Sequence, residues 1–331
     1  MIDLKQRISI IKEKQQLIKN SWPISPALIK NLWERLRIEL TYTSNAIEWN
    51  TLSRQETAMV VNDGLSVPWK KLVELLEARN HDEALAYIQK FSQTIQIHEI
   101  SEHHIQTIHS IILSNIDSEN AGIYRQVPVR ISGSLTILPN YVKVPLLMKE
   151  MIEKISSSKD DPILLACELH YIFVTIHPFV DGNWRTWRLL FNLVLLIAWY
   201  PLCFIKTSER WSYLKALEKA QIGWSKDDYN HVMLWAIERS LDLYLDAIWN
   251  KDPQLENDKS LLKIGQLARE TTETVPTIRY RTQLWLLSTS DFTDWGYTLY
   301  DRSMINRVFL IRKLQNENRM SLVEIKEFLG Q

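Results

Sequence analysis

The sequence predicts a mainly α-helical fold, in which a helical bundle is followed by a smaller helical module. Apolar residues recur at helical spacing through most of residues 1–248, whereas stretches with the alternating pattern of strands are few. A polar, proline-containing stretch at 249–260 then reads as a linker. We therefore expect an N-terminal region at 1–100, a core at 101–248 and a second domain at 261–331.

Each helix of the bundle is predicted from its apolar periodicity and from the residues that end it. Residues 1–40 should form one or two helices with a break at Pro23 and Pro26, because proline cannot continue a helix. Residues 161–176 are apolar nearly all round, which indicates a central buried helix. The other helices are expected at 68–96, 99–116, 144–157, 185–200, 208–222 and 225–245.

The composition is that of an ordinary folded chain. Its 39 basic and 39 acidic residues give no net charge, so no global basicity points to nucleic acid. The longest apolar run, 189–204, is short for a membrane span. Cys167 and Cys203 lie in apolar surroundings and read as free thiols of a reducing compartment. Because the first residues show no signal peptide, we expect a cytoplasmic protein without a membrane partner.

Residues 177–188 (HPFVDGNWRTWR) contain the parts of a phosphate-handling site. His177 can accept a proton near neutral pH, and Asp181 is a hard oxygen donor suited to Mg²⁺. A Gly-Asn pair just before a predicted helix favours a turn whose backbone N–H groups bind phosphate. Arg185 and Arg188 lie three residues apart, so on a helix they share a face and can both bind phosphate oxygens.

This stretch resembles the signature of the Fic family, His-x-Phe-x-Asp/Glu-Gly-Asn-Gly-Arg-x-x-Arg, and departs from it at Trp184, where the family has glycine. The resemblance implies a Fic-fold bundle that transfers AMP from ATP to a Ser, Thr or Tyr hydroxyl of a target protein. His177 would be the catalytic base and Asp181 the Mg²⁺ ligand. The resemblance assigns the nucleotide to Gly182, Asn183, Trp184, Arg185, Thr186, Trp187, Arg188 and, near the adenine, Tyr213.

The segment 43–48 (TSNAIE) resembles the inhibitory helix motif of one Fic class, Ser/Thr-x-x-x-Glu-Gly/Asn. Ser44 and Glu48 are four residues apart and share one helical face. The resemblance implies that Glu48 pairs with Arg188 and blocks placement of the ATP γ-phosphate. The enzyme would then be autoinhibited.

Residues 121–134 resemble the β-hairpin flap that holds the target's backbone beside a Fic site. The alternation of Val129 and Ile131 suits a strand, and Gly133 suits the turn. We expect the flap to contact the target through Ile131, Gly133 and Ser134.

The C-terminal domain resembles the winged helix-turn-helix of the MerR class. Its first helix is expected at 264–270, its recognition helix at 275–284, its wing at about 288–300 and two more helices within 303–328. The 11 basic and 9 acidic residues of 258–331 are a weak footprint for DNA. A dimerisation or target-docking module is the alternative, and a homodimer is also considered. The residues expected to contact DNA are Thr277, Arg279 and Tyr280.

Tryptophan is unusually frequent, with 13 tryptophans against 8 glycines. Several stand where the resemblances place glycine, and a bulky residue is an outlier at the positive φ of a turn. We therefore hypothesise that the host reads UGA codons as glycine and that these positions have been translated as tryptophan. The positions concerned are Trp49, Trp184, Trp199, Trp285 and Trp295, with Trp69, Trp187 and Trp224 as further cases.

Residue 184 decides between two classes of function. With glycine there, the phosphate loop is complete and an active transferase is expected. With tryptophan, the indole would displace the phosphates, and the protein would be an inactive Fic scaffold that serves as a DNA-binding regulator. A third alternative keeps the enzyme but changes the phosphate-containing group that it transfers.

Overall fold

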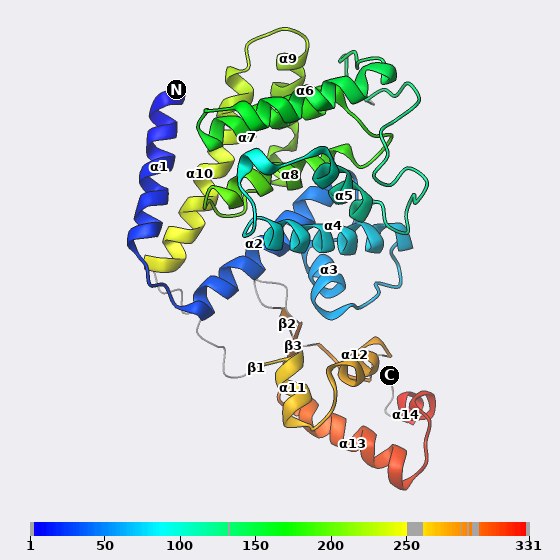
Figure 1. The fold of residues 1–331 in the computed structure, drawn as a ribbon. Helices are drawn as coiled ribbons and strands as arrows, with labels where there is room; N and C mark the ends of the chain where they lie inside the picture. The colour runs from blue at the N-terminus through cyan, green and yellow to red at the C-terminus, as the bar shows by residue number, and fades with distance from the viewer. Residues whose placement is uncertain are drawn as a thin grey trace. The chain divides into compact units, whose positions relative to one another are not determined.

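The computed structural model describes residues 3–131, 133–249, 261–284, 286–289, 291–292 and 298–328. The chain folds into two compact units (Figure 1). The first comprises Met1–Thr51 and Lys71–Lys251, and the second comprises Leu52–Lys70 and Asp252–Gln331. The second unit is therefore built from two separate stretches of the chain. The domain boundaries expected from the sequence assigned it only the C-terminal stretch.

The first unit is a bundle of α-helices at nearly the predicted positions. The expected break falls between α1 (Leu4–Asn20) and α2, which begins at Pro26. Helix α1 lies alongside α10 (Figure 1). The α-helices that follow α1 are α2 (Pro26–Ile47), α4 (Leu72–Phe91), α5 (Glu102–Ile112), α6 (Val144–Ser157), α7 (Pro162–Ile176), α8 (Asn183–Ile197), α9 (Arg210–Gln221) and α10 (Asp227–Trp249), and the 3₁₀ turns are η2 (Ile97–Glu99), η3 (Tyr141–Lys143) and η4 (Thr207–Glu209).

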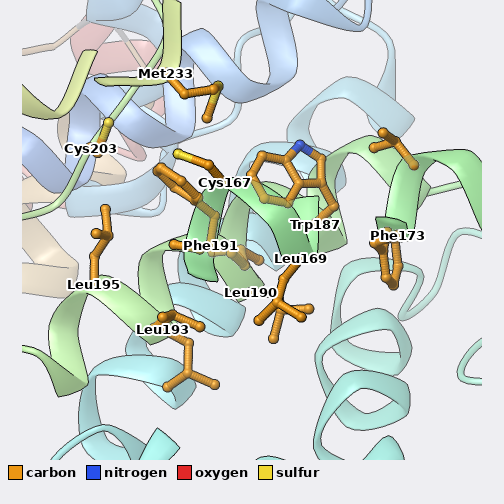
Figure 2. Packing of buried hydrophobic residues seen from close by; sticks show 14 of the residues in the cluster. Cys167, Leu169, Phe173, Trp187, Leu190, Phe191, Leu193, Leu195, Cys203 and Met233 are labelled. Carbon is orange, nitrogen blue, oxygen red and sulfur yellow. The ribbon is translucent and has the colours of Figure 1, made fainter. Parts of the chain in front are cut away.

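Two consecutive helices, α7 and α8, form the centre of the first unit. Asp161 caps α7, because its carboxylate accepts a hydrogen bond from the backbone N–H of Ile163 at 3.0 Å. Most residues of both helices are buried, which confirms the prediction of a central apolar helix. The short loop between α7 and α8 is therefore anchored at both ends in the core. Figure 2 shows this core, with Cys167, Phe173, Trp187 and Phe191 among its members.

The flap differs from the predicted β-hairpin. No described residue within 121–140 belongs to a strand. The turn is present, since the Ser134 N–H donates to the Ile131 carbonyl at 3.2 Å and Gly133 has a φ of 75°. Glu218 holds the segment, accepting from the Ser134 hydroxyl at 2.8 Å and from the next backbone N–H at 2.7 Å. Regular hairpin pairing was therefore wrongly predicted here, because a carboxylate takes a donor that a partner strand would use.

The second unit joins a short helical segment to a winged helix-turn-helix. Residues 52–70 contribute α3 (Arg54–Ala58) and a π-helix, η1 (Met59–Asp63). The three strands form an antiparallel sheet in the order β1-β3-β2. The helix positions confirm the predicted pair 264–270 and 275–284 and the two later helices. The C-terminal elements are β1 (Leu261–Lys263), α11 (Ile264–Glu270), α12 (Val275–Gln283), β2 (Asp291–Phe292), β3 (Thr298–Asp301), α13 (Ser303–Glu317) and α14 (Leu322–Phe328).

Some expectations concern positions outside the described residues. They include the linker beyond Trp249, the wing tip with Trp295, and Trp285 at the end of the recognition helix. Within the described ranges, no helix combines the length and the apolar character needed to cross a membrane.

Candidate active site

His177 ends α7 in a left-handed conformation, with a φ of 51°. Its carbonyl accepts a hydrogen bond from Arg125 Nε at 2.8 Å, which fixes the start of the loop. The side chain is buried, and burial, followed by the charge of Arg125, lowers the pKa of His177 to about 4. The imidazole is therefore neutral at pH 7 and able to accept a proton.

The loop after His177 leads into an uncapped helix N-terminus. Gly182, with a φ of 70°, is the N-cap of α8, and no side chain caps that turn. Asn183 fastens the loop, because its amide exchanges two hydrogen bonds with the backbone of Phe179, both at 2.9 Å. The first N–H groups of α8 thus form an anion-binding position of the kind that suits phosphate.

His109 of α5 ties this loop to the base of the flap. Its Nε2 donates to the carbonyl of Asp181 at 2.9 Å, and its Nδ1 accepts from the N–H of Gly122 at 2.9 Å. Because a carbonyl only accepts and a backbone N–H only donates, His109 must be the neutral tautomer protonated at Nε2. Burial is the main cause that lowers its pKa to about 4. No sequence motif marked this histidine, which the fold alone brings to the loop.

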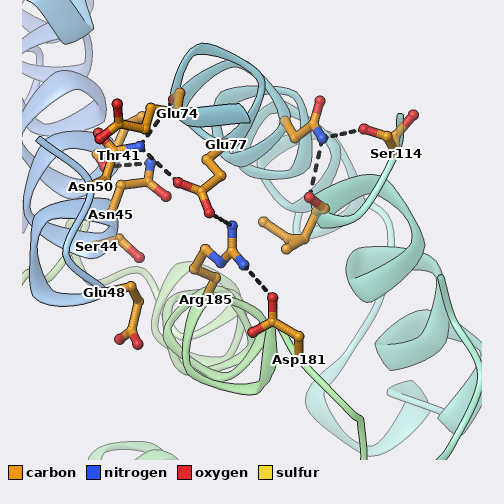
Figure 3. A network of polar contacts seen from close by, with 12 residues as sticks. Thr41, Ser44, Asn45, Glu48, Asn50, Glu74, Glu77, Ser114, Asp181 and Arg185 are labelled. Atoms are coloured by element: carbon orange, nitrogen blue, oxygen red, sulfur yellow. Dashed lines mark hydrogen bonds and ion pairs between the residues drawn. The ribbon is translucent and has the colours of Figure 1, made fainter. Parts of the chain in front are cut away.

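Arg185 is oriented by two carboxylates. Its Nη1 lies 3.0 Å from Oε1 of Glu77 on α4, and its Nη2 lies 3.4 Å from Oδ2 of Asp181 (Figure 3). Glu77 also accepts from Asn50 Nδ2 at 2.8 Å. The Arg185 side chain is almost fully buried, so its position is fixed by this network. Sequence reasoning missed Glu77, because only the packing of α4 beside α8 pairs it with the arginine.

Arg188 is held by the end of α2. Its Nε donates to Ser44 Oγ at 2.8 Å, and its Nη2 donates to the Ser44 carbonyl at 2.7 Å. The same Nη2 lies 3.0 Å from Oε1 of Glu48, the C-cap residue of α2. The ion pair that the resemblance implied is therefore present, and Ser44 reinforces it.

The aromatic residues assigned to the nucleotide, Trp184, Trp187 and Tyr213, are half-buried or buried and contact other rings. The half-buried Trp184 stands edge-on to the rings of His177 and Tyr213, with ring centroids 6.4 Å and 6.2 Å away. Tyr213 is fully buried and its hydroxyl lies 2.8 Å from Nε2 of His170. Thr186 and Trp187 are buried as well, and the Thr186 N–H donates to the Gly182 carbonyl at 3.0 Å, so neither residue is exposed to a ligand.

The oxygen ligands at the site suit a Mg²⁺ ion that is held by one carboxylate and by the phosphate oxygens of a substrate. Among the described residues, no group of three or more His, Cys, Asp or Glu side chains could hold a metal by itself. The Asp181 carboxylate is 68% exposed beside the uncapped turn of α8. One carboxylate together with phosphate oxygens is a usual Mg²⁺ environment.

The residues expected to bind DNA lie on α12 in the second unit. Tyr280 is exposed, and the Thr277 N–H donates to Oγ1 of the N-cap residue Thr274 at 3.2 Å. Arg279 is half-buried beside Gly64, where a Cβ would lie 3.8 Å from the arginine Nη1. Of these three, Arg279 is therefore engaged with residues 52–70.

Comparisons with known proteins agree with this geometry. Residues 99–195 match the model of the Fic/DOC family, and residues 262–331 match that of the MerR HTH family regulatory proteins. The chain is 32% identical over 208 residues to protein adenylyltransferase fic-1 of Caenorhabditis briggsae, which covers 62% of this chain and 41% of that protein. It is 35% identical over 213 residues to protein adenylyltransferase Fic of Nematostella vectensis, covering 62% and 48%.

A solved structure shows the same fold. The crystal structure of a Fic domain containing signaling protein from Bacteroides thetaiotaomicron is 25% identical, with a TM-score of 0.65 over 73% of this chain and 97% of that one. Residues 99–195 of this chain are therefore similar to Fic/DOC domains, and residues 262–331 are similar to MerR-type helix-turn-helix regions. The chain spans somewhat less than half the length of the two adenylyltransferases, 41% and 48%.

Proposed function

We propose that the protein is a protein adenylyltransferase that moves AMP from ATP to a Ser, Thr or Tyr hydroxyl of a target protein. One observation carries the proposal: a single loop sets a neutral histidine, His177, beside an uncapped helix N-terminus that also bears Arg185 and Arg188. The relatives named as protein adenylyltransferases support it.

In the proposed reaction, the target hydroxyl oxygen attacks the α-phosphorus of ATP while its proton passes to His177. The bond to the β-phosphate breaks, and pyrophosphate leaves. The N–H groups of α8 and the two arginines neutralise the charge that develops on the phosphates. Asp181 would hold Mg²⁺, which would supply further charge neutralisation at the same phosphates.

The ion pair between Arg188 and Glu48 supports autoinhibition. An arginine already paired with a carboxylate and with Ser44 cannot bind the γ-phosphate in the same geometry. ATP would therefore bind without the placement needed for transfer until Glu48 moves.

The flap gives the proposed target an extended surface. Backbone groups around Ile131, Gly133 and Ser134 are outside any sheet, and the nearby side chains of Leu135 and Ile137 are exposed. An extended target segment could pack against these exposed apolar side chains, which would bring its hydroxyl to His177.

A second candidate, an inactive Fic scaffold that binds DNA, is favoured by Trp184. Its indole stands between His177 and Tyr213, at the turn where phosphate would approach α8. In this case Thr277, Arg279 and Tyr280 of α12 would carry the function by contacting DNA. A cytoplasmic location, supported by the buried free thiols of Cys167 and Cys203, and a homodimer also remain predictions.

The two candidates are separated by labelled ATP. The transferase predicts that label from α-³²P-ATP enters protein, label from γ-³²P-ATP does not, and pyrophosphate appears in equal amount. Label from γ-³²P-ATP on protein would instead indicate phosphate transfer. DNA binding without any protein labelling, in a variant that lacks the Glu48 carboxylate, would support the regulator.

A further inference from the structure

Three helices of the first unit end with the same type of hydrogen bond, but two of them have tryptophan where such an end usually has glycine. The N–H groups of Asn50, Tyr200 and Trp224 each donate to the carbonyl five residues earlier, at 3.1, 2.9 and 3.1 Å. The residue before each donor is left-handed, with φ values of 71°, 63° and 98°. Such a helix end usually has glycine at the left-handed position. Here the three left-handed residues are Trp49, Trp199 and Gly223.

Neither indole has a packing reason to be at these turns. Trp49 is 76% exposed and Trp199 is 79% exposed. Trp49 has the Arg210 guanidinium 4.4 Å from a ring centroid, an interaction that is weak at an exposed site. A bulky β-carbon in the left-handed region is a strained outlier, so each tryptophan carries backbone strain without compensating burial.

Trp184 differs from these two tryptophans, because its backbone is helical and its side chain packs against the core, but it stands where the Fic signature has glycine. It is the second residue of α8, where the helix N-terminus would meet a phosphate, and its indole lies between His177 and Tyr213. Trp49 and Trp199 thus stand at left-handed turns that favour glycine, and Trp184 stands where the signature has glycine, in a chain with only 8 glycines.

We propose that the natural protein has glycine at positions 49, 184 and 199, encoded by UGA codons that its host reads as glycine. The phosphate loop would then be complete, because Gly182, Asn183 and a glycine at 184 would leave the first turn of α8 open to ATP. The statement about 184 rests on the proposed transferase function, whereas those about 49 and 199 rest on backbone geometry alone.

The decisive measurement is peptide mass mapping of the protein purified from its host. We expect glycine masses at 49, 184 and 199 and a tryptophan mass at Trp33, which packs against the core and serves as an internal control. Tryptophan at 49 and 199 would overturn the proposal. Because the measurement uses no activity, glycine at 184 in an inactive protein would remove the transferase function and leave the decoding proposal intact.

Variants of the tryptophan-containing chain provide a second readout. We expect Trp49→Gly combined with Trp199→Gly to raise the melting temperature, because glycine relieves both left-handed positions. Trp235→Gly is the matched control, since Trp235 is also partly exposed but lies in the interior of α10, where glycine weakens a helix. If the double variant and the Trp235→Gly control lost the same amount of melting temperature, the proposal would be contradicted.

An independent observation concerns Asp63 in the second unit. This carboxylate is almost fully buried at the end of η1, and its Oδ2 accepts from Thr298 Oγ1 at 2.6 Å. Thr298 begins β3, the second strand of the wing. Arg279 of the recognition helix lies beside the adjoining Gly64, and its Nε is buried without a partner among the described residues.

We infer that the Asp63–Gly64 turn occupies the position of a DNA phosphate on the winged helix-turn-helix. An acid between an arginine of the recognition helix and a hydroxyl of the wing has the charge and acceptor geometry of a phosphate oxygen. Residues 52–70 and DNA would therefore compete for the same face. The competition is linked to the active site by the chain itself, because residues 52–70 begin four residues after Glu48.

The test compares two charge-neutral variants of the whole protein on a mixed-sequence DNA duplex. Asp63→Asn should tighten binding about tenfold, whereas Asp301→Asn, which removes an exposed charge from β3, should change affinity little. Equal affinities of the two variants would overturn the competition while leaving DNA binding intact. The absence of binding in both variants would overturn DNA binding and the competition together.

Discussion

Arg188 of α8 and Glu48 at the end of α2 form an ion pair at 3.0 Å. The two residues are 140 positions apart in the sequence. The Arg188 side chain is nearly fully buried, and its Nη1 has no hydrogen-bond partner among the described residues. The arginine thus has a free donor that a phosphate oxygen could use once Glu48 is displaced.

In the protein with glycine at position 184, Glu48→Gln should therefore increase AMP transfer and self-modification. Losing the carboxylate removes the competitor of the γ-phosphate, and we expect at least a tenfold increase in rate, which corresponds to ~1.4 kcal/mol. Incorporation of α-³²P-ATP into protein measures it. Glu13→Gln, an exposed change on α1, is the control and should leave the rate unaltered.

Replacing His177 should slow transfer strongly without unfolding the protein. General-base catalysis contributes roughly 10²- to 10⁴-fold, so His177→Asn should lose that factor. Asparagine is chosen because it tolerates the left-handed backbone of this position. If His177→Asn kept its transfer rate at an unchanged melting temperature, the catalytic role would be refuted.

The pH dependence of stability follows from four buried histidines, and burial lowers the pKa of one of them, His170, well below its usual value. Burial lowers the pKa values of His177 and His109 to about 4 and that of His81 to about 3. Between these values and about 6.5 the unfolded chain binds more protons than the folded chain, so stability is lost as pH falls through this window. Denaturant unfolding at pH 7 and pH 5 should show a drop of several kcal/mol.

The same lowered pKa predicts a flat rate profile. With His177 neutral down to about pH 4, kcat/KM should show no acidic limb near pH 6.5. A limb near pH 6.5 in the plot of kcat/KM against pH would contradict a neutral His177 over this range.

Glu77 should matter for stability as well as for the site. Glu77→Ala leaves the buried guanidinium of Arg185 with only the exposed Asp181, and breaking a buried pair costs about 3 kcal/mol. Glu83→Ala on the same helix breaks an exposed pair with Arg79 and should cost under about 0.5 kcal/mol. Similar costs for the two variants, measured by urea unfolding, would contradict the role of Glu77.

Removing the Asp181 carboxylate should change the metal requirement. Asp181→Asn should raise the Mg²⁺ concentration needed for half-maximal transfer, because a neutral amide binds Mg²⁺ weakly. The melting temperature should be unchanged, since this side chain is exposed. Asp246→Asn on α10 is the control, and an identical Mg²⁺ requirement in both variants would rule out Asp181 as a ligand.

Sequence reasoning reached the parts of the protein that are encoded locally. Helix positions follow from apolar periodicity, and residues 177–188 are contiguous, so their chemistry could be read directly. Glu77 and His109 could not be predicted, because they reach the loop only through the packing of α4 and α5. The flap was mispredicted for the same reason: its partner, Glu218, is more than 80 residues away.

The twofold entry of the chain into the second unit has a consequence for engineering. A cut after Lys251 would remove most of that unit but leave residues 52–70 behind, with the apolar side chains of Val60, Leu65 and Val67, which are buried in the intact protein. The helix-turn-helix region can therefore not be removed by a single cut, and a truncated or chimeric protein would keep these apolar side chains, without their packing partners, shortly after α2. Exchanging the second unit between related proteins would need three crossover points, one at each end of residues 52–70 and one before residue 252.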